Sequence, residues 1–185
     1  MNEPSESATS ISHISTLLVD LGSNATVARK RAHQELVFLQ EAAVEPLIGE
    51  LCTSTEYGRG QAAKALGEIG DSSAAPALVE ALADDKFDVR SLATQAVVLL
   101  GGAGLTALLQ ALIERPHLTL LRESAHNVLH DGAQEKWNRQ LDPVIRVLEG
   151  PNPEVELPKS LRCFTPQKQN PRKPLDSRRI NWRRV

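Results

Sequence analysis

The sequence repeats one pattern about every 31 residues, and this period limits the folds that the chain can adopt. An arginine recurs at spacings of 30, 31 and 32 residues, and small or apolar residues follow it at +3 and +7. These positions share one face of a helix. An apolar residue also stands at +10 in the first three copies, where the fourth has Gly132. The four arginines are Arg29, Arg59, Arg90 and Arg122.

Each copy continues into a second helical pattern with apolar residues at i, i+3, i+4 and i+7. These residues are Val44, Leu47, Ile48 and Leu51; Ala75, Leu78, Val79 and Leu82; Leu105, Leu108, Leu109 and Leu112; and Leu141, Val144, Ile145 and Leu148. In the second copy, Gly70 favours a helix end and Pro76 suits the first turn of the next helix. One such hairpin has too small a core to be stable alone, so the copies must stack. We therefore predict an all-α fold, an α-solenoid (right-handed superhelix) of about four helical hairpins.

Three runs within these copies carry a resemblance to a known family. The runs AAVEPLIGEL, AAKALGEIGDSSAAPALVEAL and DVRSLATQAVVLLG resemble HEAT-like repeats of the short form found in phycobilin-lyase-type proteins. The resemblance covers about residues 25–150. It implies a superhelix that offers a surface to a protein partner, and it says little about which partner.

The two ends of the chain differ from the repeats. We predict a disordered N-terminus over residues 1–9, the solenoid over 10–150, and an extended tail rich in Pro and Arg over 151–185. Apolar residues of 10–21 share one helical face, which predicts a helix that caps the first repeat; the alternative is a free helix that docks on a partner. We expect residues 130–140, with Trp137, to form a C-terminal cap.

Charge also separates the body from the tail. Residues 151–185 contain nine Lys or Arg and three Asp or Glu, a net charge of +6, which leaves −8 for residues 1–150 because the whole chain carries −2. Such a basic tail is expected to reach an anionic surface elsewhere or to fold back on its own body. Arg and Trp dominate interface hot spots, so we predict an anchor formed by Arg178, Arg179, Ile180, Trp182, Arg183 and Arg184. The alternative is a solvated, disordered tail.

Positions beside the apolar set of the second helices predict a binding surface. They recur at i and i+4 on the side away from the first helices, and in a solenoid such stripes line the concave surface. The stripe is polar and mildly acidic, which suits a protein or peptide, whereas a nucleic-acid surface would need Lys and Arg there. We therefore expect no tight duplex DNA binding by residues 1–150. The stripe consists of Glu45, Gly49, Glu80, Thr106, Gln110, Asp142 and Arg146.

The repeated arginines predict a structural ladder. We expect each to hydrogen-bond loop carbonyls and carboxylates such as Asp88, because repeated columns usually encode packing. The alternative is an anion-binding stripe.

Residues 96–113 contain no charge over 18 positions, the minimum for a membrane span. Because Gly101 and Gly102 fall where the repeat places its turn, we expect two helices and no transmembrane segment. Val98 or Leu99 could add apolar surface for a partner; packing against the neighbouring repeats is the alternative.

No catalytic constellation is evident in the sequence. His126 and His130 have an i, i+4 spacing that could hold a metal, but no HExxH motif accompanies them. The chain also contains no His-Glu dipeptide, which the HEAT-like di-iron deoxyhypusine hydroxylases carry. Cys52, at the end of a helix expected to be buried, and Cys163 lie far apart, and the N-terminus has no signal-like apolar region, so we expect a cytoplasmic protein.

These observations predict a non-catalytic interaction, scaffold or assembly subunit without a metal or cofactor. It would bind protein partners within a larger complex and would anchor through its tail on an acidic or phosphate-bearing surface. One alternative is a phycobilin-lyase-like subunit or chromophore-protein assembly factor, which the resemblance leaves open. The other is a nucleic-acid-associated accessory subunit that uses the basic tail.

Overall fold

The computed structural model describes residues 6–131 and 135–161, and these residues form helices and turns without a strand. The α-helices in this part of the chain are α1 (Glu6–Leu21), α2 (Thr26–Phe38), α3 (Glu41–Thr53), α4 (Glu56–Ile69), α5 (Ala75–Ala81), α6 (Phe87–Leu99), α7 (Gly102–Glu114), α8 (Thr119–Asp131), α9 (Glu135–Leu148) and α10 (Pro153–Leu161). A short 3-10 helix, η1 (Ser72–Ala74), precedes α5.

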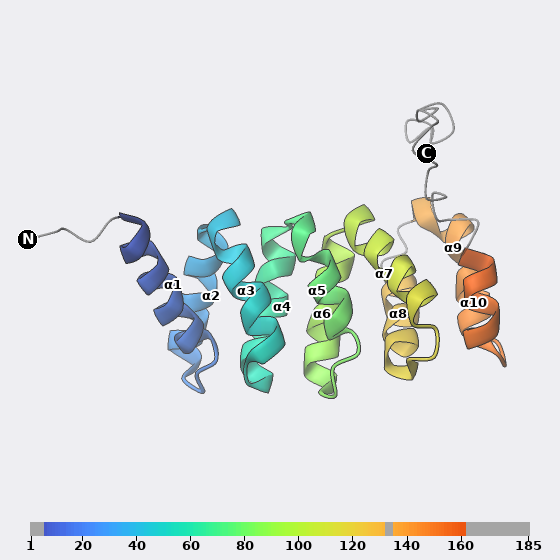
Figure 1. Ribbon diagram of the computed structural model, residues 1–185, viewed down its shortest axis with the longest axis horizontal. Helices are drawn as coiled ribbons and strands as arrows, with labels where there is room; N and C mark the ends of the chain where they lie inside the picture. The colour runs from blue at the N-terminus through green and yellow to red at the C-terminus, as the bar shows by residue number, and fades with distance from the viewer. Residues whose placement is uncertain (1–5, 132–134, 162–185) are drawn as a thin grey trace, which may run out of the picture.

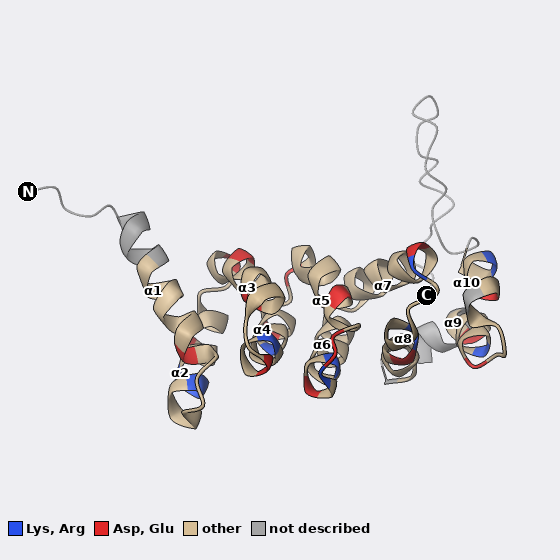
Figure 2. Ribbon diagram, turned by 60° about the horizontal axis from the view of Figure 1, so that its bottom comes forward, with Lys and Arg blue, Asp and Glu red and all other residues tan. Residues whose placement is uncertain are grey.

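The helices form two parallel rows, which confirms the predicted α-solenoid (Figures 1 and 2). We call α2, α4, α6 and α8 the first row; each packs against the next helix of that row. We call α1, α3, α5, α7 and α10 the second row, in which successive helices also pack against one another. Each hairpin from α2–α3 to α6–α7 contributes one helix to each row, so every repeat contacts mainly its neighbours.

Local sequence signals explain the helix ends. The Thr55 side chain caps α4 by accepting a hydrogen bond from the Gly58 amide at 3.2 Å. Gly70 ends α4 with φ 76°, a left-handed conformation in which an L side chain is strained. Gly101, with φ 56°, separates α6 from α7, so the long uncharged run is divided between two helices. Among the described residues, no helix is long and apolar enough to cross a membrane.

Leucines and small residues fill the space between the rows. Leu36, Leu66 and Leu108 are fully buried, and Ala62, Ala63 and Ala65 bring α4 close to its neighbours. One close approach is at Gly67 of α4, where an added Cβ would lie 2.7 Å from the Cα of Ala96 in α6. The chain contains few aromatic residues, and the Ala and Gly faces of its helices let the helix axes approach closely.

The N-terminal helix packs against the first repeat. Ile14, Leu17 and Leu21 are buried, and α1 contacts α2 and α3, the geometry that a cap requires. The helix begins at Glu6, so residues 6–9, which the sequence placed in a disordered terminus, belong to it.

The C-terminal end differs from the sequence prediction. Helix α9 begins at Glu135, inside the region 130–140 that was expected to form a C-terminal cap, and it packs against α8 and α10. Helix α10, over residues predicted to be extended, packs against α7 and continues the second row in place of α9. Leu157 and Leu161 of α10 are fully buried. The prediction of an extended tail is therefore wrong for residues 153–161. These residues form a helix because Leu157 and Leu161, one helical turn apart, can then be buried on the same side.

Candidate functional site

The outer side of the second row carries exposed, mostly polar residues on successive repeats. We call it the second-row face and define it by the exposed residues Glu41, Glu45, Gly49, Cys52, Glu80, Thr106 and Gln110. They lie on α3, α5 and α7, opposite buried residues such as Leu47 and Leu78. Glu45, Gly49 and Cys52 follow one side of α3 at helical spacing.

Charge distinguishes the two rows. Helices α3, α5 and α7 contain five glutamates and no Lys, Arg or His within their bounds. Helices α2, α4 and α6 of the first row contain six Lys or Arg and four Asp or Glu. Figure 2 shows the basic residues of these six helices on the first row. Three of the five glutamates, Glu41, Glu45 and Glu80, lie on the second-row face.

One ion pair fixes part of this face. The guanidinium of Arg115, directly after α7, donates two hydrogen bonds to the Glu80 carboxylate of α5. The hydrogen-bonded carboxylate raises the pKa of Arg115. Within the described part of the chain, no hydrogen bond or ion pair engages the carboxylates of Glu41 and Glu45. These two side chains are available to a partner.

The predicted stripe does not continue onto α9. Asp142 and Arg146 are exposed but pair with each other at 2.9 Å, and α9 packs beside α8 while α10 occupies the position next to α7. The periodic pattern identified the apolar face of α9 correctly, since Leu141 and Val144 are buried, but it did not identify the neighbour of that face. The second-row face therefore ends at α7.

Each arginine of the predicted ladder donates a hydrogen bond to a carbonyl in the loop before its own helix. The acceptors are Ser23 for Arg29 (2.9 Å), Ser54 for Arg59 (3.0 Å), Asp84 for Arg90 (2.8 Å) and Pro116 for Arg122 (2.7 Å). These bonds hold the guanidinium groups of the four arginines against the loops.

Arg59 makes a further contact that the sequence assigned to a different carboxylate. It donates to both oxygens of Asp84, at 2.7 and 2.9 Å, whereas Asp88 is exposed in the first turn of α6. The Asp84 carboxylate raises the pKa of Arg59. Burial alone would raise the pKa of Asp84, but hydrogen bonds from Arg59 and the Lys86 amide outweigh burial and lower it. Asp84 takes the role predicted for Asp88 because its loop faces Arg59.

The first row also carries a column of exposed apolar residues that was not predicted from the sequence. Val27, Tyr57 and Phe87 begin successive first-row helices and are 82%, 58% and 70% exposed. Arg29 stacks over the Tyr57 ring and Arg90 over the Phe87 ring, each at 5.7 Å. A groove of about 320 Å³ lies beside Tyr57. The 30-residue spacing of these three residues is the sequence pattern that could have predicted the column.

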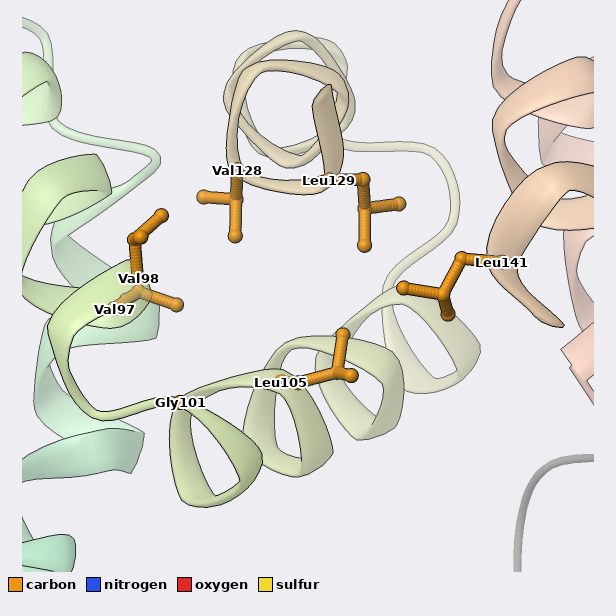
Figure 3. A pocket seen from close by; sticks show the side chains of 7 residues that line it. All are labelled: Val97, Val98, Gly101, Leu105, Val128, Leu129 and Leu141. Carbon is orange, nitrogen blue, oxygen red and sulfur yellow. The ribbon is translucent and has the colours of Figure 1, made fainter. Parts of the chain in front are cut away.

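Figure 3 shows a small apolar cavity where α6, α7, α8 and α9 meet. Its volume is about 40 Å³, well below the several hundred Å³ typical of ligand sites. Val98 lines this cavity, so its side chain takes part in internal packing, while Leu99 is largely exposed. The lining residues are Val97, Val98, Gly101, Leu105, Val128, Leu129 and Leu141.

The candidate metal ligands have other neighbours. His126 Nε2 lies 3.1 Å from Glu149 Oε1, and the rings of His126 and His130 stack at 6.1 Å. No group of three or more His, Cys, Asp or Glu in the described ranges could hold a metal ion. Cys52 is exposed, not buried as its place at a helix end suggested. The predicted anchor from Arg178 to Arg184 and the side chain of Trp137 lie outside the described residues.

Comparison with known proteins identifies the repeats. A family model described as HEAT repeats matches residues 14–98 and 44–130, which together span more than half of the chain. No curated protein matches the sequence.

Proposed function

The chain belongs to the HEAT-repeat family, and from this premise we propose that it is a non-catalytic interaction subunit that binds a protein partner on its second-row face. HEAT repeats generally mediate protein–protein interaction. The observation that carries the proposal is the charge of α3, α5 and α7, which contain five glutamates and no basic residue. Three of these glutamates lie on the second-row face, where Arg115 pairs with Glu80 and leaves Glu41 and Glu45 for a partner. Such a face suits a partner segment rich in Lys and Arg.

The expected binding is electrostatic in part. Individual exposed ion pairs contribute little, roughly 0–1 kcal/mol each. A set of like charges over three adjacent helices nevertheless steers an oppositely charged partner and excludes like-charged ones. We therefore expect association that weakens as salt increases.

The tail adds a second contact in this proposal. Its arginines would fork onto carboxylates or phosphates of the partner assembly, and Trp182 would fill an apolar pocket. This contact rests on sequence chemistry, as does the expected cytoplasmic location.

Capture from the native source tests the proposal. The full-length chain is used as bait beside the double variant Glu41→Lys/Glu45→Lys. The matched control is Asp88→Lys/Glu123→Lys, which changes the net charge equally but alters exposed first-row positions. We expect the control to retain the partner and the second-row variant to lose it. Equal recovery by both variants would refute the second-row face as the binding surface.

The resemblance to phycobilin-lyase-type repeats supplies the alternative function. A phycobilin-lyase-like subunit or chromophore-protein assembly factor would bind a bilin and show a visible absorption band. We expect no such band when the purified chain is mixed with bilin. A nucleic-acid accessory role, the other alternative, would require salt-dependent binding through the tail, measured by titration of the full-length chain with duplex DNA.

A further inference from the structure

We propose that in the free chain the basic segment 162–185 lies across the second-row face and competes with the external partner. The inference concerns the same surface as the proposed function and adds its regulation. It commits to one occupant, the chain's own C-terminal segment.

Charge complementarity selects this occupant and this face. Residues 162–185 contain eight Lys or Arg and one Asp, a net charge of +7. The second-row helices α3, α5 and α7 carry only glutamates, whereas basic residues outnumber acidic ones on α2, α4 and α6. Among these six helices, only α3, α5 and α7 therefore oppose the charge of this segment. Glu41 and Glu45 are exposed at its far end.

The place where the described chain ends supports the same contact. Leu161 ends α10, and α10 packs against α7, so the segment starts beside the second row. Neighbouring packed helices lie about 8–10 Å apart, so α3 is roughly 30 Å from α10. The 17 residues from Leu161 to Arg178 can span up to about 60 Å when extended. The arginine-rich end can therefore reach Glu41 and Glu45.

This contact gives the solenoid a release mechanism. While the tail covers the face, a basic partner must displace it, which lowers the apparent affinity of the partner. An acidic or phosphate-bearing surface that binds the tail would free the face. One basic segment thus couples two binding events through competition.

The exposed native Cys52 permits a direct test. Cys52 lies on α3 in the second-row face and is free. A nitroxide is attached there in the full-length Cys163→Ser variant, and the amide signals of residues 177–185 are recorded by NMR. We expect these signals to be broadened at about 0.1 M salt and to sharpen near 1 M, where the screening length falls from about 10 to 3 Å. Unbroadened tail signals at low salt would overturn the inference.

Two controls identify the contact. Moving the label to the exposed first-row position 64, as Lys64→Cys in a Cys52→Ser/Cys163→Ser chain, should leave the tail signals sharp. Adding Glu41→Lys/Glu45→Lys to the Cys52-labelled chain should abolish the broadening. Equal broadening from both label positions, or no effect of the charge reversal, would contradict docking on this face.

A mixing experiment separates docking within one chain from docking between two. An isotope-labelled chain without nitroxide is mixed with an unlabelled chain carrying nitroxide at Cys52. Sharp tail signals in the mixture support contact within one chain, and broadened signals would refute it. No partner protein is present, so failure here leaves the capture experiment to decide the proposed function separately.

Discussion

At the scale of single residues, paired polar groups connect successive repeats. Arg59 joins its own loop, through the Ser54 carbonyl, to the next repeat, through Asp84. Both side chains are largely buried, with 19% and 12% exposed. Removing one partner therefore leaves the other with unsatisfied hydrogen-bonding groups.

The Asp84→Asn substitution is expected to lower the free energy of unfolding by about 1–3 kcal/mol at pH 7, because it removes the charged acceptor of Arg59. The pKa of Asp84 is lowered in the folded chain, so its stabilisation is complete above the unfolded pKa and is lost as the pH falls through the folded pKa. The difference between wild type and variant should therefore shrink below about pH 4. Urea unfolding at both pH values measures it. Asp88→Asn, at an exposed position, is the control; an equal loss there would contradict the assignment.

The residue scale also shows what the sequence could predict. The repeated arginines predicted a structural role for these side chains. The hydrogen bonds that they donate to carbonyls depend only on the loop directly before each helix. The carboxylate partner of Arg59 was misassigned because its choice depends on the direction of the 84–86 loop. The first-row column Val27, Tyr57 and Phe87 shared the repeat period, but a local apolar pattern does not distinguish an exposed position from a buried one.

At the scale of helices, packing depends on small residues at close approaches. Gly67 of α4 faces Ala96 of α6 with no room for a Cβ, whereas a Cβ at Gly49 of α3 would meet nothing within 4 Å. Gly67 and Gly49 both lie within helices and differ in the space around them, so the same substitution at each position can be compared.

Gly67→Ala should destabilise the chain by about 1–3 kcal/mol, since α4 and α6 would have to separate. Gly49→Ala should instead stabilise it by about 0.5–1 kcal/mol, because alanine favours the helix. Thermal and urea unfolding followed by circular dichroism compare them. Destabilisation by Gly49→Ala, or a neutral Gly67→Ala, would argue against the described packing of these helices.

Leu157→Ala tests whether α10 belongs to the folded body. Leu157 is fully buried and Val155 is 54% exposed on the same helix. Truncating Leu157 should cost about 2–5 kcal/mol, while Val155→Ala should change stability little. A small effect at Leu157, measured by urea unfolding, would mean that α10 contributes little to the core.

The repeat period could not predict the position of α10. The pattern assigned helices α2 to α8 to their rows because every repeat offers the same neighbours. After α8 the period fails, and the position next to α7 can be filled by either following helix. The structure fills it with α10. The two prolines of this helix, Pro153 and Pro158, and Pro151 just before it favoured the prediction of an extended tail.

At the scale of the whole molecule, the second-row helices α3, α5 and α7 carry only acidic charges, whereas α2, α4 and α6 carry charges of both signs. The total of −2 conceals a glutamate-bearing second row and a tail of opposite charge. Composition predicted this division between body and tail, but only the arrangement of the helices places α3, α5 and α7, which carry glutamates without a basic residue, side by side in one row. The proposed binding surface follows from that arrangement.

The most direct measurement of the central claim is the affinity of the captured partner for the full-length chain at several salt concentrations. Wild type and Asp88→Lys/Glu123→Lys should bind equally, with dissociation constants that rise as salt increases. Glu41→Lys/Glu45→Lys should bind at least about tenfold more weakly, a loss of about 1.4 kcal/mol, and should show a smaller salt dependence. Identical affinities and salt dependence for all three proteins would contradict binding on the second-row face.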